Sequence, residues 1–207
     1  MSALAALVTS CMLSAAQIHG LPPSMLFVML HIEGGKIGET SRNTNGTFDI
    51  GPMQINSIWI PELARRWKKD HRTTLHMLTH DACTNIEAGA WILRGRIDDT
   101  RDTRIGISRY HSATPHLGSR YFERFVAKAS EIDRRLAATG QTASGDFLRA
   151  AMPRYGNAPA SPGSETAFLR IPGAVPGSPT IAVQAPPRIL EPIVEGEIAV
   201  AMTRRRS

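Results

Sequence analysis

Residues 25–33 read MLFVMLHIE, and eighteen positions after Glu33 comes a second informative stretch, GPMQIN, at residues 51–56. The first stretch is almost wholly apolar, and its pattern alone fits a buried helix or a buried strand. The Pro22-Pro23 pair before it and the Gly34-Gly35 pair after it favour a helix, because proline tolerates the first helical turn and glycine ends helices. A carboxyl group at the end of a buried helix is a candidate proton donor.

The second stretch combines a tight turn with side chains that suit a sugar. Gly51 permits a close approach of backbone. Gln54 carries amide donors and an acceptor, which match the hydroxyl and acetamido groups of sugars. Met53 is a candidate for apolar contact with a sugar ring, but core packing is the stronger explanation for it. Residues 34–50, rich in Gly, Asn, Thr and Ser, predict a long loop of the kind that often carries function.

Cleavage of a glycosidic bond needs a proton on the leaving oxygen. A carboxylic acid supplies it near neutral pH when apolar surroundings raise its pKa. Glu33 fits this requirement, although an ordinary helix-end glutamate is the alternative. Most glycosidases use a second carboxylate, and the candidates here are Glu39 and Asp49. Solvation explains the first equally well, and turn formation explains the second.

The chain divides into a mainly helical part and a tail. We expect a domain over residues 11–138, with Asp81 as the N-cap of one helix. Residues 1–10 are apolar and read either as the first helix or as the remnant of an export signal. The composition changes over residues 139–207: nine of the chain's fourteen prolines lie beyond residue 150, which predicts a flexible tail. Further helices are expected at 61–69, 82–96, 104–110 and from about residue 118 to 138.

A net charge of +6 suits a polyanionic partner: nucleic acid, an anionic membrane face or an anionic cell wall. The basic residues are scattered apart from residues 65–69 and 204–206, so no nucleic-acid partner is predicted. No apolar run approaches the roughly 20 residues of a membrane span. His76 and His80 have helical spacing, but no HExxH glutamate accompanies them, so neither a metal nor a cofactor is expected.

The apolar helix ending in Glu, the NTNG loop and the following DIGPMQIN segment resemble the soluble lytic transglycosylase domain, which has a lysozyme-like fold. The likeness covers about residues 11–135 and is most specific at 45–56. It is closest to the small single-domain branch associated with type IV secretion and conjugal transfer. The fold class it implies is mainly α, with a short β/loop segment beside the active site and a disordered C-terminal tail.

The resemblance assigns roles to individual residues. It implies that Glu33 is the single catalytic acid and base, and that the other site residues bind substrate. These are Gly51, Met53 and Gln54 of the second motif, Tyr110 of the third, and His111 beside it. Cysteines at 11 and 83 leave open a disulfide or two buried thiols, and the resemblance favours the disulfide. Three positions depart from the family pattern: Gly34 where serine is usual, Pro52 where leucine is commoner, and His111 where asparagine is usual.

What the resemblance implies chemically is cleavage of peptidoglycan between N-acetylmuramic acid and N-acetylglucosamine. The muramyl C6 hydroxyl, rather than water, closes a 1,6-anhydro ring, so no second carboxylate is required. The implied location is the periplasm or cell envelope, where the enzyme opens the wall for a transfer apparatus and its tail contacts secretion components. The alternatives are a lysozyme-type hydrolase on the same fold and a non-catalytic wall-binding assembly factor.

Overall fold

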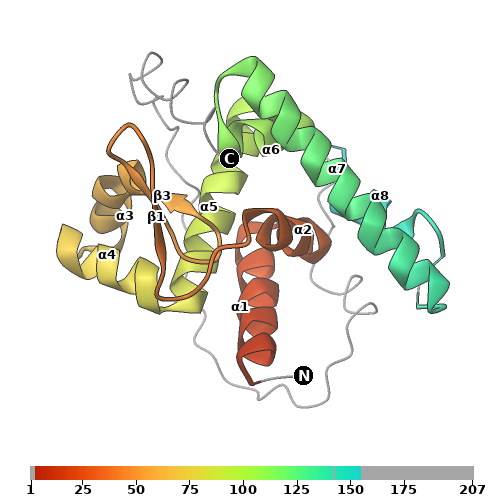
Figure 1. The fold of residues 1–207 in the computed structure, drawn as a ribbon, viewed down its shortest axis with the longest axis horizontal. Helices are drawn as coiled ribbons and strands as arrows, with labels where there is room; N and C mark the ends of the chain where they lie inside the picture. Colours follow the sequence, from red (N-terminus) through yellow and green to blue (C-terminus); the bar gives the residue numbers. More distant parts are fainter. Residues whose placement is uncertain (1–2, 142, 155–207) are drawn as a thin grey trace.

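The computed structural model describes residues 3–141 and 143–154, which form a helical body with one small sheet (Figure 1). The mainly helical class predicted from the sequence is confirmed for these residues. The elements, in chain order, are α1 (Ala3–His19), α2 (Pro23–Glu33), β1 (Thr40–Arg42), β2 (Phe48–Ile50), β3 (Ile55–Asn56), a 3-10 turn η1 (Ser57–Trp59), α3 (Ile60–Trp67), α4 (His71–His80), α5 (Ala82–Thr100), α6 (Thr103–His111), α7 (Pro115–Ala138) and α8 (Asp146–Ala151).

Helix α2 lies in the middle of the molecule, with α1 below it and α7 to one side (Figure 1). It begins at Pro23, and it ends as predicted because Gly34 adopts a left-handed conformation with φ 63°, where its N–H donates to the carbonyl of Leu30. The side chains of Leu26, Val28 and Met29 are fully buried. The apolar run is therefore a core helix, and its last residue, Glu33, carries the carboxyl group to the edge of that core.

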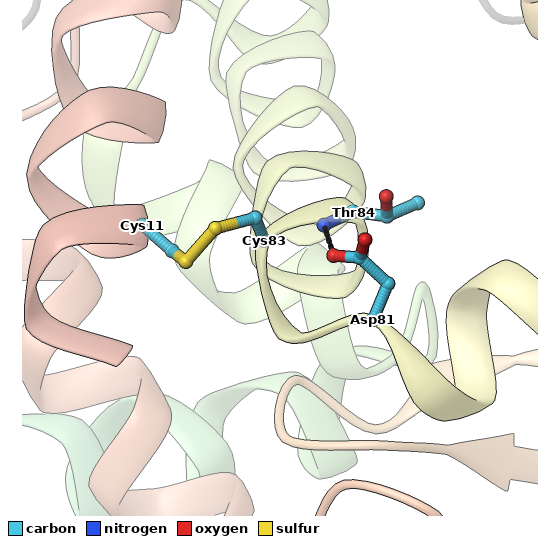
Figure 2. The surroundings of a disulfide bond; sticks show 4 residues. All are labelled: Cys11, Asp81, Cys83 and Thr84. Atoms are coloured by element: carbon cyan, nitrogen blue, oxygen red, sulfur yellow. Dashed lines mark hydrogen bonds between the residues drawn. A yellow bond between two sulfur atoms is a disulfide. The ribbon is translucent and has the colours of Figure 1, made fainter. Parts of the chain in front are cut away.

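Helix α5 packs against α1, α4, α6 and β3. Its N-terminus is capped as predicted, because the Asp81 carboxylate accepts a hydrogen bond from the Thr84 N–H at 2.8 Å (Figure 2). Its buried face carries Trp91, whose ring meets the edge of Trp59 at 6.0 Å between centroids. Burial of large aromatic side chains in edge-to-face contact is a strong source of core stability.

The segment predicted as a loop folds into a β-hairpin. Strands β1 and β2 pair antiparallel with Ser41 opposite Asp49, and β3 adds to the other edge of β2. The Asp49 carboxylate accepts hydrogen bonds from the side-chain amides of Asn43 at 3.1 Å and Asn56 at 2.9 Å. Asp49 therefore ties the hairpin turn to β3, which explains this acidic residue structurally.

Two helices extend the fold beyond the sequence prediction. Helix α4 was not predicted, and α8 lies past the domain end expected at residue 138. The buried carboxylate of Asp133 holds α8 by accepting from the backbone N–H groups of Gly145 at 2.7 Å and Phe147 at 3.1 Å. Ala151 is fully buried. The packed body thus continues through α8, and the rest of the predicted tail, from residue 155, lies outside the described residues.

A disulfide joins Cys11 of α1 to Cys83 at the start of α5, with the two Cα atoms 4.8 Å apart (Figure 2). Its partners are 72 positions apart in the chain, so it closes a loop that contains α2, the sheet, α3 and α4. Within the described residues, none of the helices combines the length and apolar character needed to cross a membrane.

Replacing both cysteines by alanine is expected to lower the free energy of unfolding by about 4 kcal/mol, because a cross-link across a loop of this length restricts the unfolded chain. Urea denaturation of the oxidised wild type and of the double variant measures the difference. Ser14→Ala, beside the disulfide on α1, is the matched control and should change little. A loss below about 1 kcal/mol in the double variant would contradict this role.

Candidate active site

Glu33 contacts a tyrosine that lies 88 positions later in the chain. Tyr121 of α7, only 2% exposed, donates its hydroxyl hydrogen to Oε1 of Glu33 at 2.5 Å, and its oxygen lies 3.3 Å from the sulfur of Met29. Glu33 itself is half-buried. The carboxyl is thus held at the end of α2 by a donor whose ring is packed in the core.

The electrostatics of the site keep its tyrosines protonated. Burial raises the pKa of Tyr121 well above its ordinary value, and the negative charge of Glu33 raises it further. The pKa of Tyr110 is raised well above the usual value by burial first, then by the charges of Glu33 and Asp49. Both phenols therefore remain hydrogen-bond donors throughout the physiological pH range.

The turn at Gly51 is fixed by a buried amide. Asn85 of α5 donates to the carbonyls of Ile50 at 2.9 Å and Leu78 at 3.0 Å, and it accepts from the N–H of Met53 at 2.8 Å. Gly51, at φ 64°, has no room for a side chain, because an added Cβ would lie 2.5 Å from the Asn85 amide nitrogen. Its role in the fold is to admit Asn85.

Met53 is placed by the structure in the core and not on a sugar-binding surface. Its side chain is fully buried against Gly89, where an added Cβ would come within 2.8 Å of the methionine. This burial corrects the substrate contact that the resemblance implied for the side chain and agrees with core packing, the explanation that the residue type favoured. Its backbone still serves the site, because the Met53 carbonyl accepts a hydrogen bond from the Tyr110 hydroxyl at 2.9 Å.

Gly35 brings the acid and the turn together. A Cβ at position 35 would lie 2.0 Å from the carbonyl oxygen of Gly51 and 2.4 Å from Nε2 of Gln54. The backbone that follows Glu33 thus packs directly on the Gly51–Gln54 turn. Gln54 has a positive φ of 48° and donates through Nε2 to the Gly51 carbonyl at 2.9 Å. The two stretches that opened the sequence analysis form one site.

Two further residues, His111 and Arg124, contact the ring of Tyr121. The ring of His111 stacks on that of Tyr121, with centroids 4.7 Å apart and planes 5° from parallel. Arg124 lies over the same tyrosine and donates to the carbonyl of Ile32 at 2.9 Å. The sequence patterns assigned no site role to Tyr121 or Arg124 and did not predict the hydrogen bonds of Asn85. The available signal was a tyrosine on a buried face, whose hydroxyl needs a partner.

The other carboxylates proposed from the sequence have different neighbours. Asp49 binds the hairpin amides described above, and Glu39 is exposed and lies 3.4 Å from the amine of Lys36. His76 and His80 contact each other at 4.7 Å between ring centroids. In the part of the chain that the structure describes, no group of three or more His, Cys, Asp or Glu side chains is arranged to hold a metal ion.

Two shallow pockets lie elsewhere. One, of about 270 Å³, lies beside the disulfide, and its Glu87 is already hydrogen-bonded to His19 at 2.9 Å. The other, of about 260 Å³, lies between α6, α7 and the chain after α8. Glu33 lines neither of them. The chemistry of the Glu33 cluster, and not cavity size, identifies it as the candidate active site.

No protein-family model, curated protein or solved structure matches the chain. What the geometry defines is a carboxyl group held by a buried phenol, beside a turn that carries an amide side chain. Chemically, a carboxyl group in this setting can exchange a proton with a polar group placed beside it.

Gly35→Ala is expected to destabilise the protein by about 1–3 kcal/mol, because the new methyl group meets the Gly51 carbonyl in a packed region. Thermal or urea unfolding measures the change. Lys36→Ala, at the next and exposed position, is the matched control. If the two variants are equally stable, the close approach of Gly35 to the turn is contradicted.

The raised pKa values predict delayed ionisation of Tyr110 and Tyr121. In full-length protein with Tyr155→Phe, absorbance at 295 nm should show little phenolate at about pH 10.5, whereas the same chain in denaturant should be mostly ionised, since free tyrosine has a pKa of about 10. Because the pKa is higher in the folded state, stability should fall as the pH rises above about 10. Equal ionisation of the folded and unfolded chains would contradict the burial of these hydroxyls.

Proposed function

We propose that the protein is a peptidoglycan lytic transglycosylase that cleaves the β-1,4 bond between N-acetylmuramic acid and N-acetylglucosamine and forms 1,6-anhydro-N-acetylmuramic acid. The observation that carries this proposal is the cluster in which Tyr121 holds Glu33 at 2.5 Å while Gly35 packs on the Gly51–Gln54 turn. From the sequence resemblance we expect the catalytic acid and the sugar-binding motif at these positions.

In the proposed reaction Glu33 acts twice. As a carboxylic acid it gives its proton to the glycosidic oxygen while the bond from that oxygen to C1 of the muramyl residue breaks. As a carboxylate it then takes the proton of the muramyl C6 hydroxyl, whose oxygen forms a new bond to C1. The neighbouring acetamido group stabilises the cation that develops between these steps. The acid is regenerated, and no water is consumed.

A mechanism with one carboxyl group agrees with the surroundings of Glu33. A retaining or inverting glycosidase normally needs a second carboxylate across the scissile bond. Asp49 is bound to two amides of the hairpin, and Glu39 is an exposed residue beside Lys36. Because the acceptor is a hydroxyl of the substrate itself, a single positioned carboxyl is sufficient.

The other residues bind and orient in this proposal. The half-buried amide of Gln54 keeps its carbonyl oxygen as an acceptor for an acetamido N–H of the glycan. Tyr110 supports the turn through the Met53 carbonyl. His111, where the family usually has asparagine, forms a wall of the site against Tyr121. A mainly helical body with one small three-stranded sheet agrees with a lysozyme-like fold.

The cellular setting is part of the same proposal. A disulfide is stable in an oxidising compartment such as the periplasm or cell envelope, and a net charge of +6 suits an anionic wall. In this role the enzyme opens the wall locally for a conjugation or type IV secretion apparatus. Contacts with that apparatus are assigned to the tail, most of which lies outside the described residues.

Glu33→Gln keeps the shape of the side chain but removes the transferable proton. We expect it to slow the release of wall fragments by about 10²–10⁴-fold, as is typical for loss of a general acid, which corresponds to about 3–5 kcal/mol in the barrier. Mass spectrometry of muropeptides released from purified peptidoglycan gives both rate and product. Glu39→Gln is the matched control and should cleave like the wild type.

The products separate the proposal from its rivals. Wild-type protein should release muropeptides with anhydro ends, each lighter by one water molecule than the reducing ends that a lysozyme-type hydrolase leaves. Release of reducing ends would show that the same site catalyses hydrolysis. Wild-type protein that binds the wall without cutting it would identify a wall-binding assembly factor. Full cleavage by Glu33→Gln would refute the mechanism itself.

A further inference from the structure

Arg124 contacts both supports of the reactive carboxyl. From α7 its guanidinium donates to the carbonyl of Ile32 at 2.9 Å, in the peptide unit that leads into Glu33. The same group lies 6.0 Å from the centroid of the Tyr121 ring, three residues earlier on α7 and therefore on the same helix face. Tyr121 in turn donates to Glu33.

The contact with Ile32 has a clear physical purpose. The last four carbonyls of an α-helix have no partner within the helix, and this end of the helix dipole is negative. A cation placed there satisfies a carbonyl and reduces the local negative potential. Because the Ile32 carbonyl belongs to the peptide plane that carries the Glu33 N–H, holding it also restricts the orientation in which the Glu33 side chain leaves the backbone.

The contact of Arg124 with Tyr121 is a second way in which the arginine acts on Glu33. The positive charge of Arg124 opposes the effect of burial on the pKa of the Tyr121 hydroxyl, so the charge is felt at that oxygen. A charge felt there also acts on the carboxyl oxygen 2.5 Å away. The guanidinium therefore affects Glu33 by two routes, through its backbone and through its hydrogen-bond donor.

We propose that Arg124 is a positioning residue of the transglycosylase reaction, which fixes the Glu33 carboxyl by clamping the end of α2 to the Tyr121 ring. This inference rests on the function proposed above. It assigns no contact between Arg124 and the reacting atoms. Arginine suits the task better than lysine, because its planar fork can donate to a carbonyl while it stacks on an aromatic ring.

The first test separates positioning from binding. Full-length wild type, Arg124→Met, Arg124→Lys and the control Arg134→Met, an exposed arginine ten residues further along α7, are assayed on soluble glycan chains of peptidoglycan. Arg124→Met should lower kcat about tenfold with KM changed less than about twofold, since a misplaced acid slows chemistry more than binding. Arg124→Lys should recover part of the loss, and Arg134→Met should match the wild type.

The second test does not depend on catalysis. Carbon-13 NMR of the Glu33 carboxyl carbon, assigned by comparison with Glu33→Gln, follows its titration in each protein. Loss of the nearby cation should raise the pKa of Glu33 in Arg124→Met relative to the wild type, because a positive charge favours the carboxylate. Arg134→Met should leave the titration unchanged, and thermal unfolding reports whether each variant remains folded.

The outcomes are distinct. Wild-type kcat in Arg124→Met, or a lower kcat with an unchanged Glu33 titration and a lower melting temperature, would overturn the inference and leave Arg124 a simple structural anchor. Either result leaves the proposed function intact. If wild-type protein releases no wall fragments, the proposed function fails, and the assignment of Arg124 to that reaction fails with it. The Glu33 titration then shows only whether the clamp controls this carboxyl.

Discussion

The backbone of Gly35 lies so close to the Gly51 carbonyl and the Gln54 amide that position 35 has no space for a side chain. The rest of the site depends on this contact. It sets the end of α2 against the turn before β3, so Glu33 and Gln54 belong to one surface. Asn85 makes the contact possible from the other side, because its three hydrogen bonds hold the turn rigid where Gly51 leaves room for it.

Helix α7 supplies further residues to the site that Gly35 and Gly51 bring together. Tyr121 comes from a position 88 residues after Glu33 in the chain, yet its hydroxyl donates directly to the carboxylate. Arg124 and His111 then contact the Tyr121 ring. A buried phenol with a raised pKa is a fixed donor, so the orientation of the acid follows from core packing and does not rely on mobile surface groups. The proposed chemistry, which asks one carboxyl to give and then take a proton, requires such a fixed orientation.

Local signals predicted the elements on which the site is built. The run from residue 25 to 33 and the glycine at 34 predicted the helix and its end, and Asp81 predicted the start of α5, because these caps act within a single turn. The hairpin at β1 and β2, helix α4 and helix α8 were not predicted. The hairpin depends in part on the Asn56 amide, which meets Asp49 from β3, and α8 depends on the Asp133 carboxylate on α7, so these contacts join separate elements rather than residues of one turn.

By itself, the sequence predicted the mainly helical class, and it singled out Glu33 as a candidate proton donor and GPMQIN as a candidate sugar-binding turn. These predictions were possible because apolar patterning and glycine placement are properties of neighbouring residues. The tertiary structure alone decided which groups surround the Glu33 carboxyl. It placed the Met53 side chain in the core, the explanation that the residue type already favoured, and it brought Tyr121 and Arg124 to Glu33. The physical reason is that a hydrogen bond or a buried contact between distant positions depends on how helices pack, and packing is a property of the whole chain.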